Sequence, residues 1–238
     1  MRIAVISDIH GNLDALDAVI ADAGAVDEWW CLGDVVGYGA EPDACVARVR
    51  DIASVALAGN HDLAAIGGAA LSRFNDDAQA CLRWTAQNLK ADHAAYLRAL
   101  PHRLERNPFT LVHASPRDPV WEYVLDGRVA RANFAHFAAQ FCLLGHTHRA
   151  GVFDERGRVT GPVEIASFAG AGRRRYICNP GSVGQPRDRD WRASYLLLEE
   201  SGQQWEWRRV AYDVDRAAAR IRAAGLPEIE AARLAVGW

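Results

Sequence analysis

The sequence predicts an α/β protein whose first third forms a parallel sheet. Short apolar runs alternate with segments in which apolar residues recur at helical spacing, and this alternation is typical of βαβ units. The first runs lead directly into glycine and polar residues, as expected where a strand ends. Half of the 238 residues are hydrophobic, which is enough for a large core. We expect one domain over residues 1–238, because no linker or repeat marks a boundary.

The first three strands follow one another at regular intervals. We expect a strand at residues 3–6 and then an amphipathic helix with Asn12 as its N-cap. Further strands are expected at 29–32 and 55–58, separated by a helix that Pro42 opens. This order predicts that all three strands end at the same edge of the sheet.

The rest of the chain is richer in strands. Residues 74–100 have helical periodicity, with Asp92 as a cap and Pro101 after the end, and residues 173–175 are expected to form an exposed charged turn. Further strands are expected at 110–113, 141–144, 175–178, 195–198 and 205–210. Further helices are expected at 129–139, 213–224 and 229–236.

Polar side chains of the kinds that bind metal ions follow the apolar runs. These candidates are Asp8, His10, Asp34, Asn60, His61, His113, His146 and His148. Carboxylate, amide and imidazole groups together suit Mn, Fe, Co, Ni or Zn, and there are enough of them for two ions. The sequence therefore predicts a metal site at the strand ends.

The spacing of these candidates predicts that they meet. Asp34 follows Asp8 by 26 residues (34 − 8), and Asn60 follows Asp34 by the same interval (60 − 34), about one βα unit each time. On an extended strand end, the side chains of residues i and i+2 point the same way, so Asp8 and His10 can reach one ion. The pair His146 and His148 repeats this arrangement, and we expect it to approach from the opposite side.

Composition excludes several classes of protein. The formal net charge of −3 gives no general attraction to nucleic acid or to an anionic membrane. The apolar start has no basic region or cleavage site of a signal peptide, and no apolar run approaches the roughly 20 residues that span a bilayer. Five cysteines without CxxC spacing are expected to be reduced and buried. We therefore expect a cytoplasmic protein.

Five motifs in order resemble those of a known family. DIHGN, GDVVGYG, GNHD, VHASP and GHTH, followed by NPGSVGQPRD at 179–188, resemble the calcineurin-like metallophosphoesterase superfamily. GDVVGYG and NPGSVGQPRD resemble its small bacterial and archaeal phosphodiesterase branch. The resemblance implies the metallo-dependent phosphatase fold, a four-layer αββα sandwich of two mixed sheets flanked by helices, with the site at the strand ends.

The resemblance also implies a role for each candidate. One metal ion would be held by Asp8, His10 and His148, a second by Asn60, His113 and His146, with Asp34 bridging the two. Two divalent ions, Mn or alternatively Fe, Co, Ni or Zn, would bind a bridging hydroxide for in-line attack on phosphorus. His61 would stay free of metal, to protonate the leaving alkoxide or stabilise phosphoryl oxygens. Asp62 is the candidate to orient it.

One departure from a neighbouring branch bears on the substrate. Protein Ser/Thr phosphatases and symmetrical dinucleoside tetraphosphate hydrolases carry an Asp-Arg pair after the second motif, and this Arg grips phosphate as a fork. This sequence has Gly37 and Tyr38 there. The difference weakens an assignment as a phosphoprotein phosphatase and is compatible with a diester substrate.

Other residues have two interpretations each. Arg187 either meets a substrate phosphate or pairs with Asp188 or Asp190, and the turn 179–184 is either a plain turn or a backbone wall beside the metals. The group Phe74, Asn75, Trp121 and Trp191 either shapes a pocket or packs in the core or on the surface. Surface or packing roles suit His93, His102 and His136, which lie outside every motif.

The sequence predicts a dinuclear metal-dependent phosphodiesterase acting on a small phosphoester or nucleotide. A phosphomonoesterase or dinucleoside polyphosphate hydrolase is the alternative. A non-catalytic scaffold of the same fold is disfavoured because every ligand is present, and a metallo-β-lactamase type of hydrolase would need HxHxDH, which is absent. We expect neither a stable nucleic-acid complex nor a membrane partner, and the oligomeric state stays open.

Overall fold

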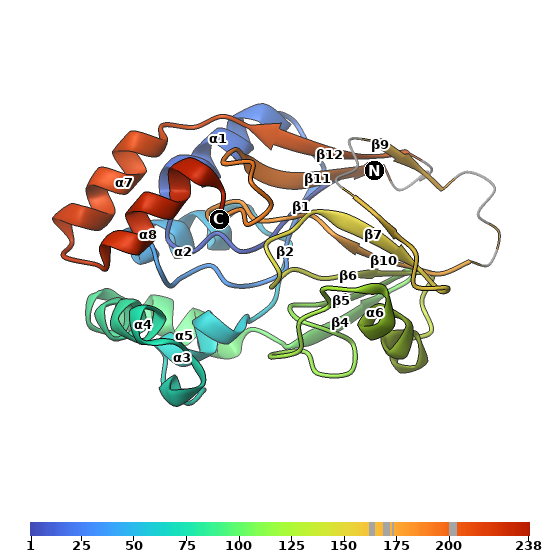
Figure 1. The fold of residues 1–238 in the computed structure, drawn as a ribbon, viewed down its shortest axis with the longest axis horizontal. Helices are drawn as coiled ribbons and strands as arrows, with labels where there is room; N and C mark the ends of the chain where they lie inside the picture. The colour runs from blue at the N-terminus through green and yellow to red at the C-terminus, as the bar shows by residue number, and fades with distance from the viewer. Residues whose placement is uncertain (162–164, 169–171, 173, 200–203) are drawn as a thin grey trace.

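Two six-stranded sheets, called sheet A and sheet B below, lie face to face with helices on their outer faces (Figure 1). The computed structural model describes residues 1–161, 165–168, 172, 174–199 and 204–238. Both sheets are mixed, with parallel and antiparallel neighbours. This arrangement confirms the expected four-layer αββα sandwich.

Sheet A carries the first three strands of the chain. Its order is β3-β2-β1-β11-β12-β9. The strands are β1 (Arg2–Ile6), β2 (Glu28–Cys31), β3 (Val55–Ala56), β9 (Ile165–Ser167), β11 (Ala193–Glu199) and β12 (Gln204–Val210). β1, β2 and β3 are parallel neighbours, whereas β11 runs antiparallel to β1. The loops after β1, β2 and β3 therefore start from one edge.

Sheet B carries the strands of the middle of the chain, in the order β4-β5-β6-β10-β7-β8. The strands are β4 (Arg103–Arg106), β5 (Phe109–Val112), β6 (Phe141–Leu143), β7 (Gly151–Asp154), β8 (Val159–Thr160) and β10 (Tyr176–Asn179). β5, β6 and β10 are parallel, and β7 returns antiparallel to β10. The segments after β5 and β6 therefore also leave sheet B at one edge.

Helices cover the outer face of sheet A. They are α1 (Leu13–Ala23), α2 (Pro42–Ile52), α3 (Asn60–Ala65), α4 (Asp76–Asn88), α5 (Ala91–Ala99), α7 (Val214–Ala223) and α8 (Glu228–Ala232), with the 3₁₀ turns η1 (Leu71–Arg73) and η3 (Arg233–Val236). Ile6 and Tyr195 of the sheet share one buried cluster with Leu16, Val46 and Ile221 of the helices. The outward strand residues are therefore covered.

A thinner layer covers sheet B on its outer side. It consists of α6 (Gly127–Asn133) and the 3₁₀ turn η2 (Phe134–His136), which Figure 1 shows beside β4 and β5. Val112, Cys142 and Ile177 of the sheet cluster with Ala130 and Phe134 of this layer.

The main apolar core lies between the two sheets. Val5, Trp30 and Trp205 of sheet A belong to one buried cluster with Leu111 and Leu143 of sheet B. Strand side chains alternate between the two faces, so neighbouring residues of one strand enter different layers. Burial of each such large side chain contributes about 1.5–3 kcal/mol, so this core fixes the sheets and the edges from which the site loops leave.

The structure confirms the expected start of both early helices. Asn12 caps α1 by accepting a 3.1 Å hydrogen bond from the Ala15 amide, and Pro42 stands at the start of α2. The expected strands are present, although β3 is only two residues long.

The helical periodicity expected over residues 74–100 is confirmed, but the segment forms two helices, α4 and α5, rather than a continuous one. Asn75 caps α4, and the chain is extended at Leu89 and Lys90 before α5 begins. The Lys90 amide donates a 2.9 Å hydrogen bond to Asp43, which replaces a bond within a continuous helix. Asp92 consequently lies in the first turn of α5, and Lys90 holds the cap position.

Other boundaries differ in smaller ways. The helix expected at 129–139 begins earlier, because Asp126 accepts from the Arg128 and Val129 amides, and it gives way to η2 after Asn133. The sequence did not predict α3, β4, β7, β8 or β9. Of the charged turn expected at 173–175, Arg173 lies outside the described residues.

Two expectations about composition can be compared with the structure. All five cysteines are free and buried, as expected. In the part of the chain that the structure describes, no helix is both long and apolar enough to span a membrane.

Candidate metal centre

The eight candidate residues gather where strands of both sheets end. Sheet A supplies Asp8 and His10 after β1, Asp34 after β2, and Asn60 and His61 after β3; sheet B supplies His113 after β5 and His146 and His148 after β6. All eight are buried, with at most 4% of any of them exposed. The two halves of the chain therefore meet at one polar cluster, as the spacing predicts.

The loop backbone at this cluster is in an unusual conformation. Five of the candidates have φ between 51° and 64°, the left-handed region that side chains other than glycine rarely adopt: Asp8, His10, Asp34, His146 and His148. The expectation that Asp8 and His10 project from an extended strand end was therefore wrong. Both side chains reach the same place because their backbones turn, and such strain is typical of functional sites.

Main-chain carbonyls orient three of the histidines. Nδ1 of His10 lies 3.2 Å from the Val36 carbonyl oxygen, Nδ1 of His113 lies 2.9 Å from that of Leu32, and Nδ1 of His148 lies 2.6 Å from that of Gln185. A carbonyl oxygen can only accept, so each Nδ1 carries a proton and donates it. Nε2 of each ring is left facing the cluster, the arrangement usual for metal-ligating histidines.

Two of these Nε2 atoms face each other. Nε2 of His10 lies 3.1 Å from Nε2 of His148. Burial lowers the pKa of both rings well below the usual value, so both are neutral and both Nε2 atoms present lone pairs. Two lone pairs at this separation repel, unless a cation binds them together. This donor set fits a metal ion.

The cluster divides into groups of ligand atoms. Asp8, His10 and His148 offer atoms within 4.8 Å of one another, and so do Asp34, His113 and His146. Asp34 also shares such a group with His10 and His61, so its carboxylate lies between the first two groups. Nε2 of His113 lies 3.3 Å from Asp34 Oδ2 and 3.2 Å from Asn60 Oδ1, which adds Asn60 to the second group.

His146 faces the cluster through its other ring nitrogen. Its Nε2 lies 3.3 Å from the Trp121 carbonyl oxygen and donates to it, so Nδ1 carries the lone pair. Burial lowers the pKa of this ring to about 3, and the charge of His113 adds to the effect. His146 is therefore neutral and available as a ligand.

In the metal-free protein, a proton on His113 supplies the positive charge of the second group. Burial alone would lower the pKa of His113, but the charge of Asp34 raises it to about 9. The pKa of Asp34 is held well below its usual value by His113 against the effect of burial. Burial raises the pKa of Asp8 to about 7, opposed by His113. The buried carboxylates thus need positive charge, which metal ions can supply.

His61 lies beside the cluster with an unused ring nitrogen. Its backbone amide donates a 2.9 Å hydrogen bond to Asp34 Oδ1, while its Nδ1 is buried without a hydrogen-bond partner among the described residues. Its ring packs between Tyr38 and Phe74, with centroids 4.4 and 4.9 Å away. Burial lowers its pKa to about 4, so the ring is neutral near pH 7.

The expectation that Asp62 orients His61 was wrong. The Asp62 carboxylate accepts four hydrogen bonds of 2.8–3.1 Å from the backbone amides of Asp34, Val35, Val36 and Gly59. As the third residue of α3, it points back toward the loop after β2, away from its neighbour in sequence. Asp62 therefore fixes the loop that carries Asp34.

Gly59 allows the loop after β3 to pass close to the Asp34 carboxylate. A Cβ atom there would overlap the Asp34 carboxylate. Only glycine leaves room for the loop after β3 to pass so near to Asp34.

The 179–188 segment is more than a plain turn. Asn179 donates 2.7 Å and 3.0 Å hydrogen bonds to the Gly145 carbonyl and the Thr147 hydroxyl, and Ser182 donates to the Asp8 carbonyl. The carbonyl of Gln185 accepts from His148. The segment therefore holds the loops that bear Asp8, His146 and His148, a role for Gln185 that the sequence did not predict.

Arg187 reaches the cluster from this segment. Its guanidinium carbon lies 5.6 Å from the centroid of the Tyr38 ring. The alternative pairing with Asp188 or Asp190 is contradicted, because Asp188 pairs with Arg209 and Asp190 with Arg192 and Arg209. An arginine thus lies beside Tyr38 although the second motif supplies none.

Aromatic side chains line the rim of the cluster. Phe74 contacts both His61 and Trp121, with centroids 4.9 and 5.4 Å apart respectively. Tyr123, which the sequence did not single out, stacks on His146 at 3.8 Å and is 46% exposed.

The remaining aromatic and polar candidates lie elsewhere. Trp191 packs near Tyr212, and Asn75 caps α4. His93 is buried against Asp43, whereas His102 and His136 are exposed. These residues have the packing or surface roles expected of them.

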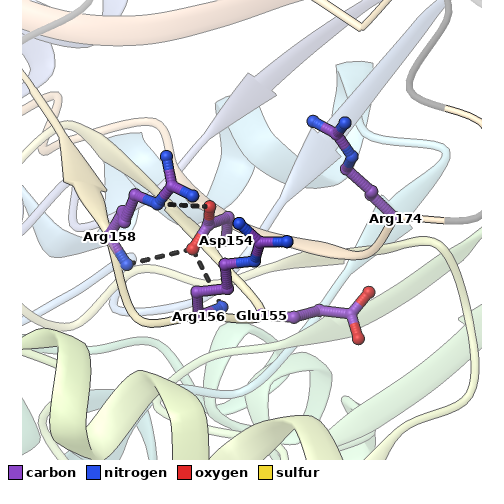
Figure 2. Close-up of a pocket in the computed structure, with 5 residues that line it drawn as sticks. All are labelled: Asp154, Glu155, Arg156, Arg158 and Arg174. Carbon is purple, nitrogen blue, oxygen red and sulfur yellow. Dashed lines mark hydrogen bonds and ion pairs between the residues drawn. The ribbon is translucent and has the colours of Figure 1, made fainter.

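Two of the cavities outside the cluster are lined by residues of β7 and its neighbours. One of about 240 Å³ adjoins its rim and is lined by residues that include Leu125, Thr147 and Arg149. The other, about 550 Å³, lies at the far end of β7 and is lined by Asp154, Glu155, Arg156, Arg158 and Arg174 (Figure 2). Asp154 accepts from the backbone amides of Arg156 and Arg158 there, so it belongs to a turn.

The chain is similar to known phosphoesterases. Residues 1–203 match the family model described as a calcineurin-like phosphoesterase superfamily domain. A metallophosphoesterase from Sphaerobacter thermophilus is 43% identical, and its crystal structure matches with a TM-score of 0.91 over 100% of this chain and 99% of that one. An uncharacterized protein of Methanocaldococcus jannaschii is 36% identical over 246 aligned positions, 99% of this chain and 98% of that protein.

A third relative matches only part of the chain. The symmetrical bis(5'-nucleosyl)-tetraphosphatase of Actinobacillus pleuropneumoniae is 31% identical over 157 residues, which cover 59% of this chain and 57% of that enzyme.

Proposed function

The chain belongs to the calcineurin-like phosphoesterase superfamily, and from this membership we propose that it is a dinuclear metal-dependent phosphodiesterase. The observation that carries the proposal is the facing pair of neutral imidazoles, His10 and His148, beside the buried carboxylates of Asp8 and Asp34. We propose two Mn²⁺ ions, with Fe, Co, Ni or Zn as alternatives that the same donor atoms suit.

Seven residues would hold the metal ions. The first ion would be bound by Asp8, His10 and His148 and the second by Asn60, His113 and His146, with Asp34 shared. Ions held by these residues would lower the pKa of a water molecule and stabilise negative charge that develops on the phosphoryl group.

The protein itself would prepare the reaction in three ways. Main-chain carbonyls fix His10, His113 and His148 in one tautomer, so the ligands need no rearrangement. His61, whose Nδ1 has no other described partner, would donate to the leaving oxygen or to a phosphoryl oxygen. The buried cluster also limits the access of water, which strengthens these interactions.

A dinucleoside polyphosphate hydrolase is the second candidate. It is favoured by the likeness to the tetraphosphatase of Actinobacillus pleuropneumoniae and by the arginine that lies beside Tyr38. Both candidates take a small phosphoester, and we propose that the enzyme acts in the cytoplasm, as one domain, without a stable nucleic-acid complex.

Hydrolysis of model substrates tests the proposal. Purified protein loaded with Mn²⁺ should hydrolyse bis-p-nitrophenyl phosphate faster than p-nitrophenyl phosphate, and chelation should abolish both activities. Asp34→Ala should be inactive, because it removes the shared ligand. Full activity after chelation would disprove metal dependence. Faster cleavage of diadenosine tetraphosphate than of any diester would favour the second candidate.

A further inference from the structure

We propose that Arg187 binds a non-bridging oxygen of the substrate phosphate, supplied from the 179–188 segment in place of the arginine that the second motif lacks. This inference rests on the proposed function and adds a substrate-binding residue to it. It is carried by the position of the side chain, by its unused donors and by the groups that hold it.

Arg187 is close to three residues of the cluster. Its backbone amide donates a 3.2 Å hydrogen bond to the carbonyl of His148, so the residue is tied directly to a candidate ligand. Its guanidinium lies over the ring of Tyr38, and that ring in turn contacts His10 and His61, with centroids 4.8 and 4.4 Å away. A phosphate bound at the cluster would therefore lie within the field of this cation.

The guanidinium has donors to spare. Nη2 donates a 2.7 Å hydrogen bond to Gln185 Oε1, whereas Nε is buried and has no hydrogen-bond partner among the described residues. No carboxylate of the described chain lies within ion-pair distance of it, since the neighbouring Asp188 pairs with Arg209. A buried N–H of a cation without an acceptor is costly, and a phosphate oxygen would satisfy it.

The side chain is held in place before substrate binds. Gln185, which accepts from Arg187, donates its own amide to Glu230 at 2.7 Å, and Glu230 is buried. The Tyr38 ring also lies beside the guanidinium, with its centroid 5.6 Å from the guanidinium carbon, and this arrangement favours arginine over lysine. Hydrogen bonds from Gln185 to Glu230 and from Arg187 to Gln185 thus position the guanidinium. Its planar set of N–H donors matches the oxygens of a phosphate.

Three variants test this assignment. Arg187→Met removes the charge with little change in length, Arg187→Lys keeps the charge without the fork, and Arg187→Ala opens space for added guanidinium. The control is Arg189→Met, because Arg189 is exposed and directly follows the 179–188 segment. Each Mn²⁺-loaded protein is titrated calorimetrically with inorganic phosphate, and its metal content is measured separately.

We expect Arg187→Met to bind phosphate about 10- to 100-fold more weakly, the effect of losing one or two hydrogen bonds from a charged donor. KM for bis-p-nitrophenyl phosphate should rise more than kcat falls, metal content should not change, and guanidinium should partly restore Arg187→Ala. The control should match the unaltered protein.

Unchanged phosphate binding in Arg187→Met would overturn the inference. If Arg187→Met loses its metal, the other two variants decide. Arg187→Lys that keeps its full metal content and wild-type phosphate affinity, with no rescue of Arg187→Ala by guanidinium, would show that Arg187 has a structural role. That result would also overturn the inference. The phosphate titration also separates the two proposals. A protein that hydrolyses no phosphoester yet binds phosphate through Arg187 would refute the proposed function alone.

Discussion

The buried Nδ1 of His61 has no described hydrogen-bond partner, and this residue makes the most specific prediction. Replacing it with Ala should lower kcat about 100-fold or more for alkyl phosphodiesters, whose leaving groups need a proton. The loss should be much smaller for bis-p-nitrophenyl phosphate, whose leaving group is stable as an anion. Burial lowers the pKa of this ring to about 4, so a bound phosphate must raise it before it can act as an acid.

The comparison of leaving groups decides between two roles for His61. Equal losses of kcat for both kinds of substrate would contradict proton donation and indicate that the ring stabilises phosphoryl oxygens instead. His136→Ala serves as the control, because His136 is exposed and lies outside the cluster.

Individual candidate residues were predictable because their order and spacing are encoded locally. Asp8, Asp34 and Asn60 follow consecutive strands, so a parallel sheet places them together. The sequence left two interpretations open for Arg187 and did not indicate that Tyr123 lies beside the cluster. Their positions depend on how distant loops pack, and a single arginine or tyrosine in a loop carries no periodic signal.

The loop after β2 depends on a side chain from α3. We predict that Asp62→Ala lowers the free energy of unfolding by about 2–5 kcal/mol, because four backbone amides lose their acceptor in a buried place. Asp62→Asn should lower the free energy of unfolding by less, because the side-chain oxygen of Asn can still accept hydrogen bonds from these amides. Guanidinium unfolding of the protein in a chelator measures this effect without a contribution from bound metal.

The control for this experiment is Asp51→Ala at the exposed end of α2, which should change stability by less than about 0.5 kcal/mol. Equal stability of Asp62→Ala and the unaltered protein would contradict the anchoring role of Asp62.

Helices and strands were predictable where local chemistry determines them. Asn12 and Pro42 mark true helix starts, and short apolar runs mark β1, β5 and β11. The break between α4 and α5 was not, because it depends on the bond from the Lys90 amide to Asp43, 47 residues away. The left-handed backbone at Asp8 and His10 was also hidden, since neither residue type requires it.

Metal binding should be coupled to proton release. In the metal-free protein His113 has a pKa raised to about 9 against the effect of burial, and burial raises that of Asp8 to about 7. Both residues must lose their protons to bind a cation. Metal affinity should therefore fall as the pH drops below about 9, and fall more steeply below about 7.

Calorimetric titration with Mn²⁺ in buffers of different ionisation enthalpy measures this coupling. We expect about one proton released per protein at pH 8 and more at pH 6, from His113 first and then Asp8. Binding that releases no protons at pH 7 would contradict the assignment of His113 as a ligand.

The arrangement of the molecule explains why the cluster needs both sheets. Sheet A supplies Asp8, His10, Asp34 and Asn60, while sheet B supplies His113, His146 and His148. The buried core between the sheets, which includes Trp30 and Trp205, therefore fixes the distance between the two sets of ligands. The resemblance in motif order predicted this four-layer architecture, which composition and periodicity alone left open.

The most direct test of the proposed centre is the anomalous diffraction of crystals grown with Mn²⁺. We predict two manganese peaks, one bound by Asp8, His10 and His148 and the other by Asn60, His113 and His146, with the Asp34 carboxylate between them. A single peak, or manganese bound away from these residues, would contradict a dinuclear centre.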